Sequence, residues 1–407
     1  MDKKRLFPVI FVVFVDLLGF GLILPLLPYY ASTFGASDFV TGLLVASYAA
    51  MQLVGAPVLG RLSDRFGRRQ ILLVSIFGTF LGFLLLGFAN SLWMLFASRI
   101  LDGFTGGNLS VAQAYISDVT DEKNRSMGLG MIGAAFGIGF IIGPAAGGFL
   151  SQWGYAVPAF LAASLALINL GLVAFWLPES LTPEKRASMP EKQPGFTLSA
   201  LLDALKRPFS GSLLITRFFF GLPFAIFQTI FSLYALKKFE LGAQETGLIL
   251  AYVGVLSVIV QGFLIGQLTR RFREDGLIAV SVVVMAISLL GWALSPSVFW
   301  LIAVLTPTAI AGGVLNTVLA STLTKAVEPQ EIGGILGLSA SVESLTRAIA
   351  PTLGGALLGW AGTSAPGFFS AAMLAVLSVY VWRVIYGHPI AAEIRAKSAP
   401  APTGISH

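Results

Sequence analysis

The sequence predicts an all-α integral membrane protein in which twelve transmembrane helices form two pseudo-symmetric bundles of six. Of its 407 residues, 56% are hydrophobic and only 11% are charged, whereas about a quarter of the residues in soluble domains carry charge. The mean hydropathy is +0.84. Two further observations specify the architecture: twelve apolar runs have the length of a membrane span, and the last six repeat features of the first six.

The first apolar run follows Lys3, Lys4 and Arg5 and reaches Tyr30. A basic start also marks a signal peptide, but this run is too long and lacks a cleavage site of small residues, so it predicts a retained first helix. The other eleven spans, with boundaries good to a few residues, lie at about 39–60, 70–90, 93–116, 126–150, 155–177, 211–236, 244–268, 275–295, 298–324, 331–358 and 365–386.

A polar interval divides the first six spans from the last six. Residues 178–210 include Pro178, Pro183, Pro190 and Pro194 among charged side chains, a composition typical of a linker. The end of the chain is rich in Ala, Pro and Ser and is expected to be disordered. We therefore expect an N-terminal bundle at 1–177, a cytoplasmic linker at 178–210, a C-terminal bundle at 211–386 and a disordered tail at 387–407.

Basic residues predict the orientation in the membrane. If both termini are cytoplasmic, 22 of the 26 Lys and Arg residues lie on the inner side, and only Lys237 and Lys238 lie outside. Arg99 and Arg347 fall inside spans. This bias is typical of a multi-pass protein of the cell (inner) membrane, and it explains the basic residues better than nucleic-acid binding does.

The side chains that support catalysis or metal binding are scarce. The chain has no cysteine and only two histidines, His388 and His407. We find no His cluster for a metal, no catalytic triad and no phosphate loop. The sequence therefore does not predict an enzyme, a metal site or a cofactor.

A shift of 207 positions aligns landmarks of the two halves with one another. The matches are Gly130 with Gly337, Pro144 with Pro351, Gly147 and Gly148 with Gly354 and Gly355, and Trp153 with Trp360. Such duplication is typical of transporters whose two halves move about a site near the bilayer midplane. A duplicated channel or scramblase is the alternative, but the pattern favours alternating access.

The turn Gly60-Arg61-Leu62-Ser63-Asp64-Arg65-Phe66-Gly67-Arg68-Arg69 separates the second and third spans. Its glycine allows a conformation that bulky residues avoid, and its arginines need water or lipid phosphate. The pattern resembles the loop signature of the major facilitator superfamily of transporters. The counterpart beginning at Gly266 has no acid that matches Asp64.

The resemblance implies that this turn is a conformational latch. We expect Asp64 to cap a helix N-terminus or to pair with an arginine in one state of the protein. Asp118, at the end of the fourth span, is a second candidate, although a plain solvated helix end is an equal alternative. The expected latch residues are Gly60, Asp64, Arg65, Gly67, Arg68 and Asp118.

The fifth span is rich in glycine and contains one proline. The residues are Gly130, Gly139, Gly143, Pro144, Gly147 and Gly148. Small residues let neighbouring helices approach closely, and proline permits a bend. The spacing resembles a motif associated with antiporters of the same superfamily, so the resemblance implies exchange of substrate for a counter-ion.

Charges inside the spans are the candidates for transport chemistry, because each charged side chain at the centre of a span costs roughly 3 kcal/mol or more unless it is paired or hydrated. Asp16 lies near the middle of the first span. Arg99 and Asp102 are three residues apart, and Glu343 and Arg347 are four apart, so each pair shares a helix face. The alternative, that each pair only neutralises itself, stays open.

Two stretches resemble proton-driven drug antiporters. Residues 16–28 resemble the first helix of the tetracycline/proton antiporters, and 99–107 resemble a fourth-helix signature in which the arginine is tied to proton transfer. Asp102 departs from that signature, where a small apolar residue is expected. We expect proton coupling by the five intramembrane charges, with Asp16 or Asp102 as the proton carrier and substrate competing for the same charge.

Polar side chains on apolar helices are expected to line the substrate cavity. They are Asn108, Gln113, Gln228, Gln261 and Asn316. The three acids and two arginines inside the spans leave a slightly negative interior, which favours a cationic or zwitterionic amphipathic substrate.

Together these features predict a monomeric transporter of the major facilitator fold. It would export small drug-like molecules in exchange for protons, with the proton gradient as energy source, no cofactor, and the lipid bilayer as its surroundings. One alternative is a uniporter or symporter of a metabolite such as a sugar or organic anion. Another is a receptor or assembly factor on a transporter scaffold.

Overall fold

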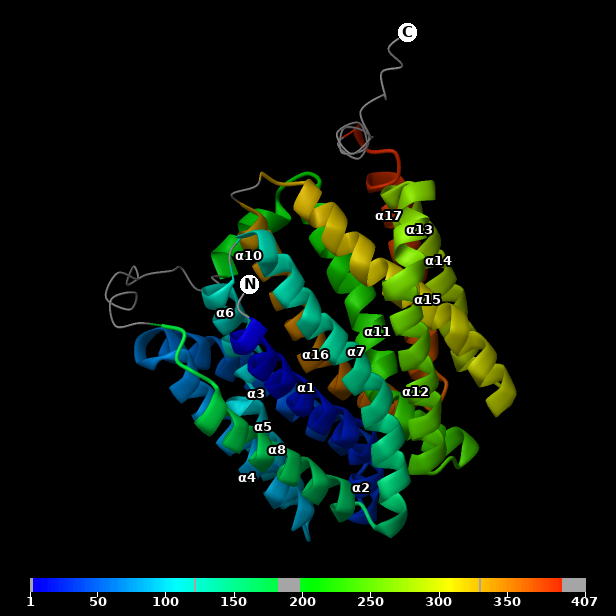
Figure 1. Ribbon diagram of the computed structural model, residues 1–407. Helices are drawn as coiled ribbons and strands as arrows, with labels where there is room; N and C mark the ends of the chain where they lie inside the picture. The colour runs from blue at the N-terminus through cyan, green and yellow to red at the C-terminus, as the bar shows by residue number, and fades with distance from the viewer. Residues whose placement is uncertain (1–2, 121, 182–197, 329–330, 390–407) are drawn as a thin grey trace. The chain divides into compact units, whose positions relative to one another are not determined.

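The computed structural model describes residues 3–120, 122–181, 198–328 and 331–389, and this part of the chain contains helices and no strands (Figure 1). The central residues of the expected linker, 182–197, and nearly all of the expected tail, 390–407, lie outside the described residues. The expected all-α membrane fold is confirmed.

The helices follow the expected spans closely. Those of the first half are α1 (Lys3–Ile23), η1 (Leu24–Leu26), α2 (Leu27–Thr33), α3 (Asp38–Phe66), α4 (Arg68–Gly87), α5 (Leu92–Thr105), α6 (Asn108–Val119), α7 (Glu122–Leu150), η2 (Ser151–Trp153) and α8 (Ala156–Trp176). Those of the second half are α10 (Leu198–Leu205), α11 (Ser210–Phe239), α12 (Ala243–Ile259), the π-helical turn η3 (Val260–Leu264), α13 (Ile265–Arg271), α14 (Glu274–Ala293), α15 (Val298–Lys325), α16 (Ile332–Ala361) and α17 (Ala365–Val384).

Within the described residues, ten spans are long and apolar enough to cross a membrane. The first of them, Pro8–Thr33, joins α1, η1 and α2, and another, Ala243–Arg271, continues through the π-helical turn. The eleventh expected span is the 30-residue helix α16, which carries Glu343 and Arg347.

The fourth expected span corrects the sequence prediction, because 93–116 is not one continuous helix. Helix α5 ends at Thr105 and α6 begins at Asn108, so the chain breaks at Gly106 and Gly107. The break frees backbone carbonyls in the apolar interior, where each needs a donor. The side chain of Ser75 donates to the Thr105 carbonyl, and Gln52 Nε2 donates to the Gly106 carbonyl at 2.9 Å.

The helices divide into two compact units. Unit 1 takes the described residues within Met1–Gly195, Ala225–Val255 and Arg347–Pro366. Unit 2 takes those within Phe196–Phe224, Leu256–Thr346 and Gly367–His407. Unit 1 therefore holds the first half of the chain together with parts of α11, α12 and α16.

In unit 1, α1 packs against α7 and α8, and α4 packs against α5 and α8 (Figure 1). Two apolar clusters fill this unit, one around Leu72 and Tyr115 and the other around Leu44 and Leu95, each of which is fully buried. In unit 2, α14 packs along α15.

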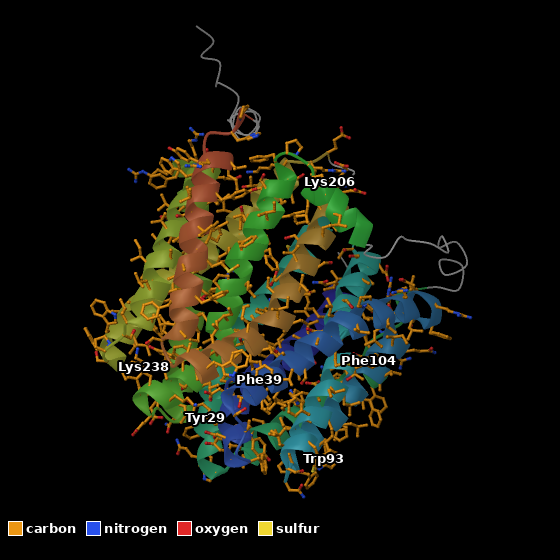
Figure 2. All side chains as sticks on the ribbon, turned by 180° about the vertical axis from the view of Figure 1, so that it is seen from behind. Tyr29, Phe39, Trp93, Phe104, Lys206 and Lys238 are labelled. Atoms are coloured by element: carbon orange, nitrogen blue, oxygen red, sulfur yellow. The ribbon has the colours of Figure 1, made fainter. Side chains whose placement is uncertain are left out.

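Large apolar side chains also cover the outer surface. Phe175 is 88% exposed, Phe299 is 85% exposed and Trp360 is 81% exposed. Apolar surfaces of this extent mark contact with lipid. Two of the exposed aromatic residues, Phe39 and Trp93, are labelled in Figure 2, whereas Tyr29, also labelled there, is buried.

Candidate functional site

The central group of polar residues in unit 1 surrounds Tyr48, and we call Asp16, Tyr48, Arg99, Asp102 and Arg347 the Tyr48 cluster. Tyr48 lies on α3 within electrostatic range of the four charged residues, which come from α1, α5 and α16. The structure thus brings together four of the five intramembrane charges singled out from the sequence. The fifth, Glu343, belongs to unit 2.

Arg99 and Asp102 form the ion pair that their spacing predicted. Arg99 Nη1 lies 3.1 Å from Asp102 Oδ2, and the two side chains are only 2% and 4% exposed. The guanidinium also lies over the ring of Phe83, 5.5 Å from its centroid. Its Nη2 is buried and has no hydrogen-bond partner in the described part of the chain. Arg99 therefore keeps one donor that its present contacts leave unused.

Asp16 has a different environment from Asp102. It lies on α1 in a half-buried position, near Asn108 and within electrostatic range of the Asp102 carboxyl group. Among the described residues it forms no ion pair. Two acids therefore lie close to each other. Asp102 is bonded to Arg99, whereas Asp16 has no arginine partner among the described residues.

Tyr48 is held by a residue that the sequence analysis did not single out. Its hydroxyl accepts a hydrogen bond from Gln52 Nε2 at 3.2 Å, and the same nitrogen donates to the Gly106 carbonyl at the helix break. The ring of Phe20 lies 5.2 Å from that of Tyr48. Tyr48 carries no charge, which is why a search for intramembrane charges did not find it.

In unit 2, the structure adds a partner for Glu343. Arg217 Nη2 on α11 lies 2.8 Å from Glu343 Oε2, and Arg217 Nη1 donates to the Asn316 carbonyl at 3.3 Å. Arg217 is mostly buried, with a side chain 10% exposed. The sequence signal that could have identified Arg217 is its position near the end of an apolar run.

The expected latch converges on Arg68, the first residue of α4. Its Nη1 lies 2.7 Å from Asp64 Oδ1 and its Nε lies 3.1 Å from Asp118 Oδ2. Ser180 also donates to Asp118 Oδ2, at 3.0 Å. Asp118 is therefore bonded to Arg68 and Ser180, and its side chain is 16% exposed. Asp64 pairs with Arg68, which is one of the two roles expected for it.

The helix cap at this turn comes from Glu179, which the sequence analysis did not name. Its carboxylate oxygens accept hydrogen bonds from the backbone N–H groups of Arg68 and Arg69, at 2.9 Å and 3.2 Å. An acid at a helix N-terminus satisfies free donors and interacts favourably with the helix dipole. Glu179 thereby ties the chain after α8 to the start of α4.

The other latch residues differ in their environment. Gly67 has φ of 110°, a conformation that favours glycine, so its position in the turn requires this residue. A Cβ atom on Gly60 would meet no atom of a neighbouring element within 4 Å, so the structure offers no steric reason for a glycine there. The guanidinium of Arg65 lies over the ring of Phe66.

Glycines of α7 line a close contact with α1. A Cβ atom on Gly143 would lie 2.6 Å from Gly21 Cα, and one on Gly139 would lie 3.2 Å from the Leu17 backbone. A Cβ on Gly147 would overlap the Leu22 carbonyl, whereas Gly130 has no neighbour within 4 Å. Three of the five motif glycines thus permit one helix-to-helix seam.

Two pseudo-equivalent contacts lie elsewhere in unit 1, and we call them the paired helix contacts. In the first, a Cβ on Gly247 of α12 would meet the Pro144 carbonyl and lie 3.3 Å from Gly148 Cα of α7. In the second, a Cβ on Gly42 of α3 would meet the Pro351 carbonyl and lie 3.2 Å from Gly355 Cα of α16. Pro351 and Gly355 are the residues that the 207-position repeat aligns with Pro144 and Gly148.

Polar bonds accompany both contacts. Tyr29 Oη lies 2.6 Å from Thr246 Oγ1, and Gln152 Nε2 donates to Gln244 Oε1 at 2.6 Å. On the other side, Lys237 Nζ lies 2.6 Å from Asp38 Oδ1. Lys237 entered the sequence analysis only as an outer charge, and Asp38 not at all, because their pairing joins residues that are 199 positions apart.

The expected cavity residues are spread over both units. Asn108 is 5% exposed and lies beside Asp16, whereas Gln113, Gln228 and Gln261 are exposed. Gln261 lies on the π-helical turn, a feature frequent at functional sites, and packs near Gly313 of α15. Asn316 joins the Arg217 group through its backbone carbonyl. A role in substrate binding stays a prediction for all five.

These features define a multi-pass membrane transporter: a duplicated helical fold, buried charges and close glycine contacts between helices. A family model described as Major Facilitator Superfamily matches residues 9–298 and 213–406. The chain belongs to this superfamily of secondary transporters and is not an enzyme.

Its relatives include known resistance proteins. The chain is 33% identical over 350 residues to the tetracycline resistance protein, class H, of Pasteurella multocida, covering 84% of this chain and 85% of that one. It is 34% identical over 341 residues to solute carrier family 22 member 18 of Mus musculus, covering 82% and 84%. The crystal structure of the human organic anion transporter MFSD10 (TETRAN) matches with a TM-score of 0.67 at 22% identity, over 93% of this chain and 99% of that one. The last match concerns the fold alone.

Proposed function

We propose that this protein exports small amphipathic cations or zwitterions in exchange for protons. It would reside in the cell (inner) membrane as a monomer with both termini in the cytoplasm, because most basic residues then lie on the inner side. The bundles at 1–177 and 211–386 would alternate access to a shared site. Resistance proteins among the relatives support a drug-like substrate.

The observation that carries this proposal is Asp16, an acid in the middle of a span without an ion pair in the described part of the chain. A charge in this position is costly, and the nearby Asp102 carboxyl group adds repulsion. Binding of one proton, or of one cationic group of a substrate, to the Asp16 carboxylate removes both the cost of the buried charge and the repulsion from Asp102. Because the two compete for the same carboxylate, binding of one favours release of the other, which is the requirement for antiport.

Arg99 supplies the coupling between the two acids. It is bonded to Asp102 and retains an unused donor on Nη2. A small shift of the guanidinium toward Asp16 would stabilise the ionised form of that acid, and its return would favour protonation. Tyr48 lies among these groups and is a neutral hydrogen-bonding surface for substrate. The Arg68 network and the α7 glycines would serve as the latch and the sliding seam between states.

Purified protein in proteoliposomes tests the proposal, with a pH-sensitive dye in the lumen and a panel of cationic, zwitterionic, anionic and neutral compounds outside. We expect cationic or zwitterionic compounds to trigger proton movement in the wild type and not in Asp16→Asn. The matched control is Asp203→Asn, the same chemical change at an acid whose side chain is 74% exposed. Transport that proceeds equally with and without a pH gradient would refute proton coupling.

A further inference from the structure

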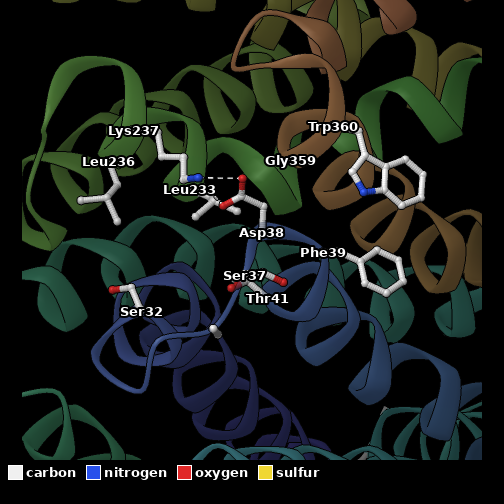
Figure 3. A pocket seen from close by; sticks show the side chains of 11 residues that line it. Ser32, Ser37, Asp38, Phe39, Thr41, Leu233, Leu236, Lys237, Gly359 and Trp360 are labelled. Atoms are coloured by element: carbon white, nitrogen blue, oxygen red, sulfur yellow. Dashed lines mark hydrogen bonds and ion pairs between the residues drawn. The ribbon is translucent and has the colours of Figure 1, made fainter.

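A pocket of about 300 Å³ lies at one end of unit 1, away from the Tyr48 cluster. Its walls come from α2, α3, α11 and α16, and Figure 3 shows the Lys237 ammonium group directed at the Asp38 carboxylate, with Trp360 and Phe39 side by side at one margin. Leu233 and Leu236 add apolar surface. The pocket therefore combines an ion pair, aromatic rings and an aliphatic wall.

The ion pair keeps capacity for a further ligand. Lys237 Nζ lies 2.6 Å from Asp38 Oδ1 and 2.7 Å from Asp38 Oδ2. An ammonium group has three donors and a carboxylate has about four acceptor sites, so the pair uses about two of each. The Lys237 side chain is 43% exposed, whereas that of Asp38 is 10% exposed. One donor on the positively charged Lys237 and about two acceptor sites on the negatively charged Asp38 therefore remain, next to each other.

The position of the pocket along the helices matches the depth of lipid headgroups. Asp38 is in the first turn of the spanning helix α3, and Lys237 is in the last turn of α11. Trp360, 81% exposed, stacks on Phe39 with ring centroids 6.1 Å apart. Exposed aromatic rings at the ends of spanning helices are typical of the membrane–water interface.

From this arrangement we infer that the pocket binds an ethanolamine phospholipid. Its primary ammonium donates to Asp38, and its phosphate accepts from Lys237. The neutral protein pair favours a zwitterion over an anionic lipid, which Asp38 repels. A choline headgroup has the same charges but no N–H donor, so the carboxylate cannot form a hydrogen bond with it.

A bound headgroup stabilises one conformation of the transporter. It bridges α3 and α11 beside the contact of Gly42 with Pro351 and Gly355, which joins α3 to α16. A ligand that binds only when these helices are together shifts the population toward that state. The lipid thus strengthens the paired helix contacts without entering the Tyr48 cluster.

The test uses a thiol cross-linking reporter at the other contact. Gln152 and Gln244 are hydrogen-bonded at 2.6 Å, and the chain has no cysteine, so Gln152→Cys with Gln244→Cys supplies the only pair of thiols, which a short bifunctional thiol reagent bridges across the gap left by the two shorter side chains. The double variant is placed in nanodiscs of phosphatidylglycerol mixed with either phosphatidylethanolamine or phosphatidylcholine. We expect cross-linking to be roughly fivefold to tenfold faster with ethanolamine lipid, the effect of one added charge-assisted hydrogen bond.

Substitutions in the pocket separate lipid binding from the stability of the contacts themselves. Asp38→Asn is expected to abolish the difference between the two lipids, whatever its effect on the absolute rate. Lys238→Gln is the matched control, because this neighbouring lysine lies over the rings of Tyr234 and Phe239 and should preserve the lipid difference. Native mass spectrometry should detect one ethanolamine lipid fewer on Asp38→Asn than on Lys238→Gln.

Equal cross-linking in the two lipids, or a lipid difference that survives Asp38→Asn, would overturn the inference. Glycerophosphoethanolamine added to the protein in detergent carries the same headgroup without acyl chains. If it reproduced the full effect, a soluble ligand would replace the lipid as the occupant. None of these readouts involves transport, so the result is independent of the proposed antiport.

Discussion

Arg217 and Glu343 illustrate how single charged residues constrain this protein. They are 126 positions apart and lie within hydrogen-bonding distance in unit 2. Arg217 is nearly inaccessible and gains its other bond from a backbone carbonyl. A cation in such a place depends on its partners, because the loss of one of them leaves an uncompensated charge.

We therefore expect Glu343→Gln to lower the free energy of unfolding by about 1–3 kcal/mol, less than for a fully buried pair because Glu343 is 35% exposed. The measurement is thermal unfolding in detergent. Adding Arg217→Gln should recover part of the loss, since it removes the orphaned charge. A double variant less stable than either single variant would contradict the pairing.

A second ion pair lies outside the spans and makes stability depend on pH. Arg207 Nη2 lies 2.9 Å from Glu331 Oε1, and this hydrogen bond lowers the pKa of Glu331 below its usual value. The folded pKa is then below the unfolded one. The stabilisation is fully present above the unfolded pKa, about 4.3, and is lost as the pH falls through the folded pKa.

Arg207→Gln should therefore reduce stability slightly at neutral pH and have no effect at the acid end of the transition. The effect is small because both side chains are exposed and screened by solvent. Unfolding curves across the acid range measure it, with Lys206→Gln as the control at the adjacent lysine. A difference that grows as the pH falls would have the wrong sign.

At the scale of helices, neighbouring helices pack closely where glycine residues face one another. Helix α7 meets α1 through Gly139, Gly143 and Gly147. The same helix meets α12 through Pro144 and Gly148, and α16 repeats that arrangement against α3. One helix therefore presents separate glycine surfaces to two neighbours, which explains why its glycines are so frequent.

The α7 seam predicts different outcomes for chemically identical changes. Gly143→Val should cost about 1–3 kcal/mol through overpacking, because its side chain would overlap the Gly21 backbone. Gly130→Val should be tolerated, since no atom lies within 4 Å of its Cβ position. Thermal unfolding and yield of folded protein after purification measure both, and equal effects at the two sites would refute the seam.

At the scale of the whole molecule, the orientation in the membrane is open to a direct test. Cysteine can be introduced singly, because the chain has none. Asn90 lies in the exposed turn before α5, and Lys206, between α10 and α11, has a side chain 78% exposed. The distribution of basic residues predicts that these two positions lie on opposite sides of the membrane.

An impermeant maleimide applied to intact cells should therefore label Asn90→Cys. Lys206→Cys should react only after the membrane is made permeable. Labelling of both positions in intact cells, or of Lys206→Cys alone, would contradict the proposed orientation. Labelling of both in permeable cells confirms that each cysteine is accessible.

The sequence by itself determined the fold class, the family and most of the helices. Long apolar runs follow from the lipid environment, and the duplication and the loop motif are visible along the chain without any structure. It also identified Asp16, Arg99 and Asp102, since a charge within an apolar run stands out without any structure. The pairing of Arg99 with Asp102 was also predictable, because residues three positions apart on a helix lie on the same face.

Only the tertiary structure decided which distant residues meet. Glu179 caps α4, Arg217 bonds Glu343, Asp38 bonds Lys237 and Tyr48 stands among four charges. The helix break at Gly106 and Gly107 likewise depends on donors from other helices. Local spacing carries no information on such contacts, because they arise when separate helices pack and each buried polar group must find a partner.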